Sequence, residues 1–330
     1  MGMADPRLKQ LFDDTMSKAM SRQATCMHPR CNNNAIKSHI LQKSLILKPI
    51  APKNQLYCFQ PNSSFNPQIL HYRKVGINSA MTYQGFCNEH DCSIFKPIEN
   101  KNVDWSNINS QYILGYRTVC RELDIKQRMF LFLNDMYPMV NPALLNHYFY
   151  SLKGLESGID DLKTYKKIIE NGVFNHDYTG YSFQTIVSDY LLELCISSSV
   201  TVSYSKIINK DIVDADLIEL NIINIFPFNG KSIIMVGFAN HCENIWAHDL
   251  VKKIQNVKSF LEYSKILNDL ILFRTEFNCM SEKLYNSIPE NEMQQFLREY
   301  KENENNRSVR LTSDLNLFHT FVEQVTVNQQ

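Results

Sequence analysis

Two short motifs bring metal-binding side chains together at close spacing. One is CMHPRC at residues 26–31, a C-x4-C motif, and the other is CNEH at residues 87–90, a C-x2-H motif. Each motif places two thiolate or imidazole groups at chelating distance, and two such motifs supply the four ligands of a closed tetrahedral zinc site. A bound zinc adds folding free energy to a small, loop-rich region. The predicted zinc ligands are Cys26, Cys31, Cys87 and His90.

Two neighbouring side chains compete for the same metal. His28 lies inside the first motif, and Cys92 follows the second. The four predicted ligands are alternatively unrelated residues, since the chain has nine cysteines and nine histidines. Two chelating pairs close to one acid-free stretch are harder to explain by chance than one pair. We therefore predict structural zinc, with His28 and Cys92 left open as rival ligands.

The distribution of charge sets the N-terminal region apart. The chain has 34 basic and 34 acidic residues, yet residues 15–88 contain nine basic residues and neither Asp nor Glu. This segregation favours an N-terminal module that faces DNA or RNA, because basic side chains position a phosphate backbone. The alternative is a basic surface that docks on the acidic remainder of the chain. The predicted nucleic-acid contacts are Lys37, Lys43, Lys48, Arg73 and Lys74.

Between the two motifs lies KSHILQ, in which His39 is eight residues after Cys31. A cysteine pair, then Ser-His-Ile, then F-C-x-x-H-D resembles the zinc-stabilised HNH nucleases of the His-Me finger superfamily. The resemblance implies that His39 is the general base that activates water, and that Asp91 holds a catalytic Mg²⁺ or Mn²⁺. The chemistry is reasonable by itself, since a histidine near neutral pKa accepts a proton and a divalent cation stabilises charge on a phosphate.

The resemblance covers residues 25–100 and differs from the family pattern at three positions. Ser38, a poor metal ligand, precedes His39 where the family has Asp or His. Gln42 stands where proline is common, and Thr82 stands where the family has its asparagine.

The elements that must position these residues follow from periodicity and turn signals. A helix is predicted over residues 6–20, and helices over 108–171 with stops at Pro138 and Gly172. An antiparallel sheet is predicted near residues 190–239, with a turn at Phe228-Asn229-Gly230. Helical spacing returns over residues 243–255, 257–273 and 289–305.

A chain of 330 residues exceeds one compact core, so we predict an α+β protein in three parts. Residues 1–105 form a zinc-clipped treble-clef or ββα-type module with an N-terminal helix. Residues 106–187 are helical, and residues 188–330 combine an antiparallel sheet with helices for regulation or for binding a protein partner.

Other candidate residues carry weaker signals. The segment 240–243 (NHCE) and the pair His248-Asp249 contain ligand types but no second pair, so the start of a helix explains them. For Arg117, Arg121 and Glu122 we expect a solvated helix face, with nucleic-acid contact or pairing to Asp91 as the alternative. The chain has no GxGxxG, P-loop or GxSxG motif.

The cellular location of the protein is predicted from two features that the sequence lacks. No run of about twenty apolar residues exists, so no membrane span is predicted. The N-terminus has no apolar signal-peptide core, which predicts a cytoplasmic protein whose cysteines are thiols or metal ligands.

These observations favour a metal-dependent endonuclease that hydrolyses phosphodiester bonds of DNA or RNA. A nuclease module on a larger body without a motor motif suggests an antiviral defence or toxin effector. The alternative is a zinc-stabilised module that binds nucleic acid or protein without catalysis.

Overall fold

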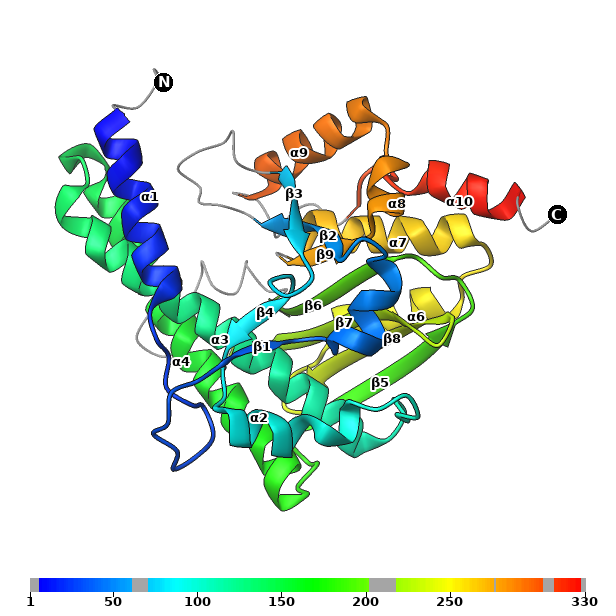
Figure 1. The fold of residues 1–330 in the computed structure, drawn as a ribbon, viewed down its shortest axis with the longest axis horizontal. Helices are drawn as coiled ribbons and strands as arrows, with labels where there is room; N and C mark the ends of the chain where they lie inside the picture. The colour runs from blue at the N-terminus through cyan, green and yellow to red at the C-terminus, as the bar shows by residue number, and fades with distance from the viewer. Residues whose placement is uncertain (1–5, 61–70, 202–217, 276, 305–311, 328–330) are drawn as a thin grey trace.

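The computed structural model describes residues 6–60, 71–201, 218–275, 277–304 and 312–327. Within these ranges an antiparallel seven-stranded sheet lies at the centre, with helices on both of its faces (Figure 1). The predicted mixture of helices with an antiparallel sheet is therefore confirmed. No helix in the described ranges is long and apolar enough to cross a bilayer.

The strand order of the sheet is β3-β2-β9-β6-β7-β8-β5, and all neighbours pair antiparallel. Helices cover both faces, so β7 is buried along its whole length, which explains its continuous apolar sequence. The strands are β2 (Gln55–Gln60), β3 (His71–Gly76), β5 (Tyr181–Ser188), β6 (Leu194–Thr201), β7 (Leu220–Phe228), β8 (Lys231–Ala239) and β9 (Asn278–Met280).

The sheet includes the predicted segment near residues 190–239 and extends beyond it. The predicted turn joins β7 to β8, and Asn229 and Gly230 both have positive φ, 50° and 78°, as a two-residue type I′ hairpin requires. Strands β2 and β3 come from residues 1–105 and join the sheet through β9. β5, at the end of the predicted helical part 106–187, is also a strand of this sheet, so all three predicted parts of the chain share one sheet.

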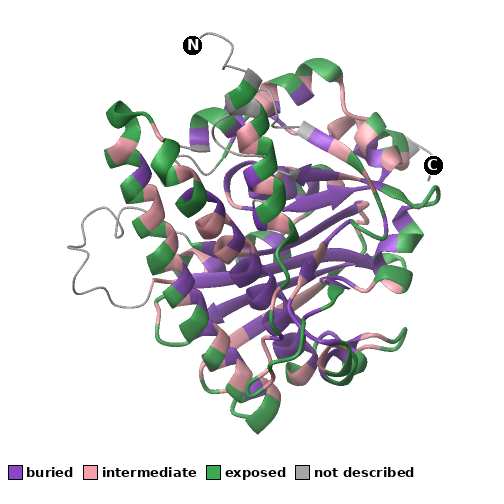
Figure 2. Ribbon diagram, turned by 60° about the vertical axis from the view of Figure 1, so that its left-hand side comes forward, coloured by how far each residue is buried: buried purple, intermediate pink, exposed green. Residues whose placement is uncertain are grey.

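Two layers of helices enclose the sheet, and Figure 2 shows its buried strands between helices with exposed outer faces. Helices α3 and α4 form a hairpin in the core on one face, and α6, α7, α9 and α10 pack in the core on the other. The helices are α1 (Pro6–Ser21), α2 (Asn88–Phe95), α3 (Ile108–Met136), α4 (Leu145–Asn175), α6 (Ile245–Gln255), α7 (Phe260–Phe273), α8 (Glu282–Asn286), α9 (Glu290–Glu304) and α10 (His319–Val327). Shorter helical turns are Lys43–Leu47, Lys48–Ile50, Lys96–Ile98, Tyr137–Met139 and Pro142–Leu144.

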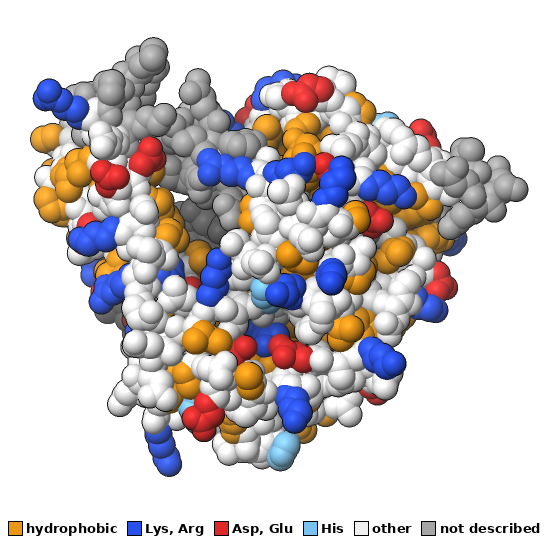
Figure 3. All heavy atoms as spheres, in the orientation of Figure 1, with side chains coloured by type: hydrophobic (Ala, Val, Ile, Leu, Met, Phe, Trp, Pro, Cys, Tyr) orange, Lys and Arg blue, Asp and Glu red, His pale blue; other side chains and the backbone are white. Residues whose placement is uncertain are grey.

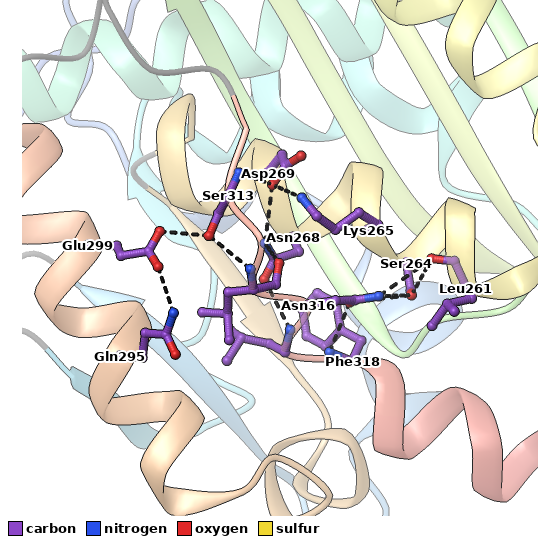
Figure 4. Close-up of polar contacts among 12 residues, drawn as sticks. Leu261, Ser264, Lys265, Asn268, Asp269, Gln295, Glu299, Ser313, Asn316 and Phe318 are labelled. Atoms are coloured by element: carbon purple, nitrogen blue, oxygen red, sulfur yellow. Dashed lines mark hydrogen bonds and ion pairs between the residues drawn. The ribbon is translucent and has the colours of Figure 1, made fainter.

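Polar contacts fasten the segment before α10 against α7 and α9 (Figure 4). Asn268 Nδ2 donates to the Leu315 carbonyl at 2.9 Å, and the Leu317 N–H donates to Asn268 Oδ1 at 3.2 Å. Ser313 Oγ donates to Glu299 Oε2 at 2.7 Å. These buried bonds satisfy backbone groups outside regular structure, so the C-terminal segment is an integral part of this layer.

The predicted helix stop at Pro138 is confirmed, since α3 ends at Met136. The predicted stop at Gly172 is wrong, because α4 continues to Asn175. A Cβ at Gly172 would lie 2.1 Å from the ring of Tyr112, so glycine is present to admit that ring.

We therefore expect Gly172→Ala to destabilise the protein. Tyr112 is fully buried and its hydroxyl donates to the Tyr181 carbonyl at 2.7 Å, so the ring has little freedom to move. Overpacking costs about 1–3 kcal/mol, which exceeds the gain of about 1 kcal/mol from replacing a helical glycine with alanine. Gly154→Ala is the matched control in the same helix, because its Cβ would meet no atom within 4 Å. Thermal melts should shift down for the first variant and slightly up for the second; equal shifts would contradict the steric explanation.

Candidate metal centre and histidine site

The structure brings the four predicted zinc ligands into one cluster. Their ligand atoms all lie within 4.8 Å of one another. Cys26 Sγ and Cys87 Sγ lie 3.5 Å and 3.2 Å from His90 Nδ1, and Cys31 Sγ lies 3.9 Å from Cys87 Sγ. This Cys₃His set can hold a metal ion, and it is the only group of three or more potential ligands found in the described part of the chain.

Local backbone structure explains how each motif presents its pair. Cys26 and Cys31 flank a turn in which the Cys31 N–H donates to the His28 carbonyl, and Arg30 adopts a left-handed conformation with φ of 65°. Cys87 is the N-cap of α2 and His90 lies in its first turn, so the C-x2-H spacing points both side chains to the same side. The spacing within each motif therefore sets the ligand geometry.

The donor set also fits zinc in its dimensions. Zinc bonds of about 2.3 Å to sulfur and 2.0–2.1 Å to nitrogen in a tetrahedron separate neighbouring ligand atoms by roughly 3.5–3.8 Å. Three of the separations, 3.2 Å, 3.5 Å and 3.9 Å, are close to these values, and all of them are within 4.8 Å. Burial raises the pKa of Cys26 to about 11, whereas the backbone N–H of His90 lowers the pKa of Cys87 to about 7.

Neither rival ligand joins the cluster. His28 stacks face to face on the His90 ring, with 3.7 Å between ring centroids and 7° between planes. Cys92, one turn further along α2, is exposed. His28 therefore packs against a potential ligand, and Cys92 faces solvent.

His39 ends a short strand next to this cluster. β1 (Lys37–His39) pairs antiparallel with β4 (Thr82–Gln84), and α2 begins four residues after β4. The chain order is thus strand, strand, helix, with β2 and β3 inserted between the two strands. The antiparallel register places His39 opposite Thr82 and Lys37 opposite Gln84, three residues before the second cysteine motif.

The hydrogen bond of His39 defines its tautomer. Nε2 lies 2.8 Å from the Ile77 carbonyl oxygen, and a carbonyl only accepts, so Nε2 carries the proton. Nδ1 is then a proton acceptor, and it has no hydrogen-bond partner among the described residues. Burial lowers the pKa of His39, and Lys43, Arg117 and Lys37 act in the same direction, against the Ile77 hydrogen bond. The imidazole is therefore neutral near pH 7.

Asp91 lies on α2 and interacts electrostatically with His39. Burial raises the pKa of Asp91, while Arg117, Ser38 and His39 act to lower it. The Ser38 hydroxyl is buried beside this carboxylate without a well-formed hydrogen bond. His39, Ser38 and Asp91 thus share one polar site, although they do not form a preassembled three-ligand cation group.

Arg117 is a buried side chain that contacts Asp91 in this polar site. Its Nη2 donates to Glu99 Oε1 at 2.7 Å and lies 3.7 Å from Asp91 Oδ1, and its guanidinium lies 3.8 Å from the Phe95 ring centroid. The expectation of a solvated helix face is wrong, because Arg117 is only 1% exposed. The alternative pairing with Asp91 is the arrangement observed.

Arg121 and Glu122 are also buried, where they pair with each other at 3.0 Å. The reason is that α3 lies between α4, the sheet and the N-terminal elements, so every residue from Ser110 to Asp124 is buried. The weaker candidates at 240–243 and His248-Asp249 belong to no potential metal group found among the described residues.

The predicted nucleic-acid contacts divide into two sets. Lys37 and Lys43 are exposed near His39, and their ammonium groups contact Ser79 Oγ and Asn78 Oδ1 at 3.0 Å and 3.3 Å. Lys48 is exposed as well. Lys74 instead forms an ion pair at 2.7 Å with Glu282 of α8, and Arg73 is half-buried on β3. Figure 3 shows Lys and Arg side chains distributed over this face.

Sequence reasoning missed Glu99 and the Ile77 carbonyl as neighbours of the site. Glu99 lies eight residues after Asp91 and beyond the end of α2, so no helical spacing in the sequence links the two carboxylates. Ile77 offers only a backbone atom, which leaves no trace in residue type.

Comparison with protein-family models, with curated protein sequences and with solved structures finds no match to this chain.

Proposed function

We propose that this protein is an endonuclease that hydrolyses phosphodiester bonds of DNA or RNA, with His39 as the general base. The observation that carries the proposal is the hydrogen bond from His39 Nε2 to the Ile77 carbonyl. It fixes the ring and leaves a neutral Nδ1 to accept a proton from water. The strand-strand-helix order around His39 and Asp91 supports the resemblance to HNH nucleases.

The Cys₃His cluster would hold one structural zinc, which clips the loop of residues 26–31 to the start of α2. Asp91 and Glu99 would hold a catalytic Mg²⁺ or Mn²⁺, since such ions are often bound by one or two carboxylates with water and substrate phosphate. A divalent cation supplies positive charge to the phosphate when it is bound. No disulfide joins any of the nine cysteines, all of which lie among the described residues, and reduced thiols are typical of a cytoplasmic protein.

A second function is favoured by one observation. Arg117 already contacts both carboxylates that a catalytic cation would use. An Asp91 neutralised in this way suits a zinc-stabilised module that binds nucleic acid or protein without cleaving it. The two functions share the zinc and the basic surface, and they differ only in catalysis.

Cleavage assays decide between these functions. Purified protein is incubated with single- and double-stranded DNA and RNA in Mg²⁺, in Mn²⁺ and in EDTA. Endonuclease function predicts internal cuts that require the cation, while binding without cleavage in every condition would support the second function. Nicking of a circular substrate excludes contaminating exonucleases.

Nucleic-acid binding is expected to depend on the lysines near His39 and to weaken steeply with salt. Reversal of Lys37, Lys43 and Lys48 to Glu should lower affinity and reduce the salt slope by about three, one for each lost phosphate contact. The matched control reverses three exposed lysines of the opposite helical layer, Lys252, Lys253 and Lys258. Fluorescence anisotropy measures both. If the two triple variants bind alike, the predicted contact surface is wrong.

A further inference from the structure

An uncharged, apolar surface lies at the end of the α3–α4 hairpin. The hairpin tip, defined here as residues 137–152, contains no Asp, Glu, Lys or Arg, although 21% of the whole chain is charged. It holds five of the eleven exposed large hydrophobic side chains of the described residues. These five are Tyr137, Met139, Leu144, Phe149 and Tyr150.

The exposed side chains of the tip are distinct from the buried side chains that form the local core beneath them. Phe132, Leu133 and Tyr148 pack together with residues of α1, and this small core supports the tip from inside. The next two residues of α4, Phe149 and Tyr150, point outward and are 46% and 64% exposed. A helix that is apolar on both its inner and outer sides is usually buried on both sides. The outer side of α4 at the tip is instead exposed, so no part of the described chain covers it.

The charged residues around the tip indicate which class of partner fits this surface. The charged residues that flank the tip in sequence form ion pairs, with Asp135 3.6 Å from Lys18 and Lys153 2.6 Å from Glu156. An anionic membrane or a nucleic acid binds a surface that carries unpaired cations, and a charged peptide binds a surface of the opposite charge. Two copies of an uncharged apolar surface complement each other without repulsion.

We propose that the hairpin tip is a dimerisation surface, at which the tip of one copy packs against the tip of a second copy about a two-fold axis. In Figure 1 the α3–α4 hairpin and α1 extend away from the sheet at the left, so two tips can meet while the sheets stay apart. Hydrophobic side chains gather at the same edge in Figure 3.

The size of the surface sets the expected affinity. Five side chains of about 200 Å² each, between a third and two-thirds exposed, present on the order of 500 Å². Apolar patches of this size are commonly functional. A standard interface buries about 800 Å² on each partner, so the dimer should be weak, with a dissociation constant in the micromolar range.

Sedimentation velocity over ~1–100 μM tests this range. The wild type should pass from monomer to dimer, and the double variant Phe149→Asp with Tyr150→Asp should remain monomeric. The matched control is Val187→Asp with Ile245→Asp, because these side chains are 52% and 64% exposed elsewhere on the surface. A wild type that is monomeric throughout overturns the proposal, as does a control that dissociates equally. If the double variant melts early, Leu144→Asp replaces it.

A charge-pair experiment tests the two-fold contact itself. Phe149→Asp and Phe149→Lys should each be monomeric, because like charges then meet at the axis. Mixing the two variants should restore a dimer at micromolar concentration. Failure to restore it, or binding of monomeric wild type to neutral phosphatidylcholine vesicles, would overturn tip-to-tip dimerisation.

Discussion

Replacement of His39 by alanine is expected to lower the cleavage rate by roughly 10²–10⁴-fold, the usual contribution of a general base. Metal content and thermal stability should stay near the wild type. The physical reason is that His39 contacts the Ile77 carbonyl and lies outside the metal cluster, so its removal takes away the proton acceptor and no metal ligand. Plasmid nicking rates and metal analysis measure the two effects on the same preparation.

His241→Ala is the control, because His241 is exposed on a different part of the surface and belongs to no potential metal group. Two results would contradict the role of His39. Loss of metal from His39→Ala would make His39 a ligand, and cleavage at the wild-type rate would leave the non-catalytic binding module as the better proposal.

The pH dependence of the same reaction gives an independent readout. Burial and the nearby Lys43 and Arg117 lower the pKa of His39 from its ordinary value of 6.5. Protonation inactivates a general base, and a lowered pKa delays protonation as pH falls. The acid limb of kcat/KM should therefore lie below pH 6.5. A limb at or above that value would show that another group limits the rate.

The metal cluster could be predicted because its geometry is mostly local. Each pair of ligands is separated by a few residues, so residue type and spacing alone place the two side chains together. The meeting of the two pairs depends on pairing between β1 and β4, which are more than 40 residues apart. The sequence supported that step through the occurrence of two chelating pairs close to one acid-free stretch and through the family resemblance.

The surroundings of Asp91 could not be predicted in the same way. Arg117 was expected in solvent because an isolated charged residue on a helix is usually exposed. It is buried because Asp91, Glu99 and Phe95 on another segment provide counter-charges and a ring to stack on. Similarly, β9 has only three residues and pairs with both β6 and β2, of which β2 lies more than 200 residues earlier in the chain. Both features depend on tertiary partners that leave no periodic pattern.

Removal of the metal is expected to have the largest effect on stability. Cys87→Ser should reduce bound zinc from one per chain to near zero. Structural zinc contributes on the order of 10 kcal/mol in small zinc modules at pH 7, which is comparable with the ~5–15 kcal/mol that stabilises a whole domain. Cys92→Ser is the matched control, since Cys92 is exposed on the same helix and outside the cluster. Metal lost from the Cys92 variant, or retained by the Cys87 variant, would overturn the ligand assignment.

The way in which the metal-free protein unfolds tests whether residues 1–105 form a separate module. Cys26 and Cys87 lie in the same hydrophobic core as Tyr112 and Tyr116 of α3, and β2 and β3 pair into the central sheet. Loss of the metal should therefore weaken the core that the N-terminal residues share with the body, because no boundary separates the two sets of contacts. We expect calorimetry of Cys87→Ser, or of wild type in a chelator, to show one transition at a lower temperature. A body that still melts at the wild-type temperature after the N-terminal residues unfold would instead establish an independent module.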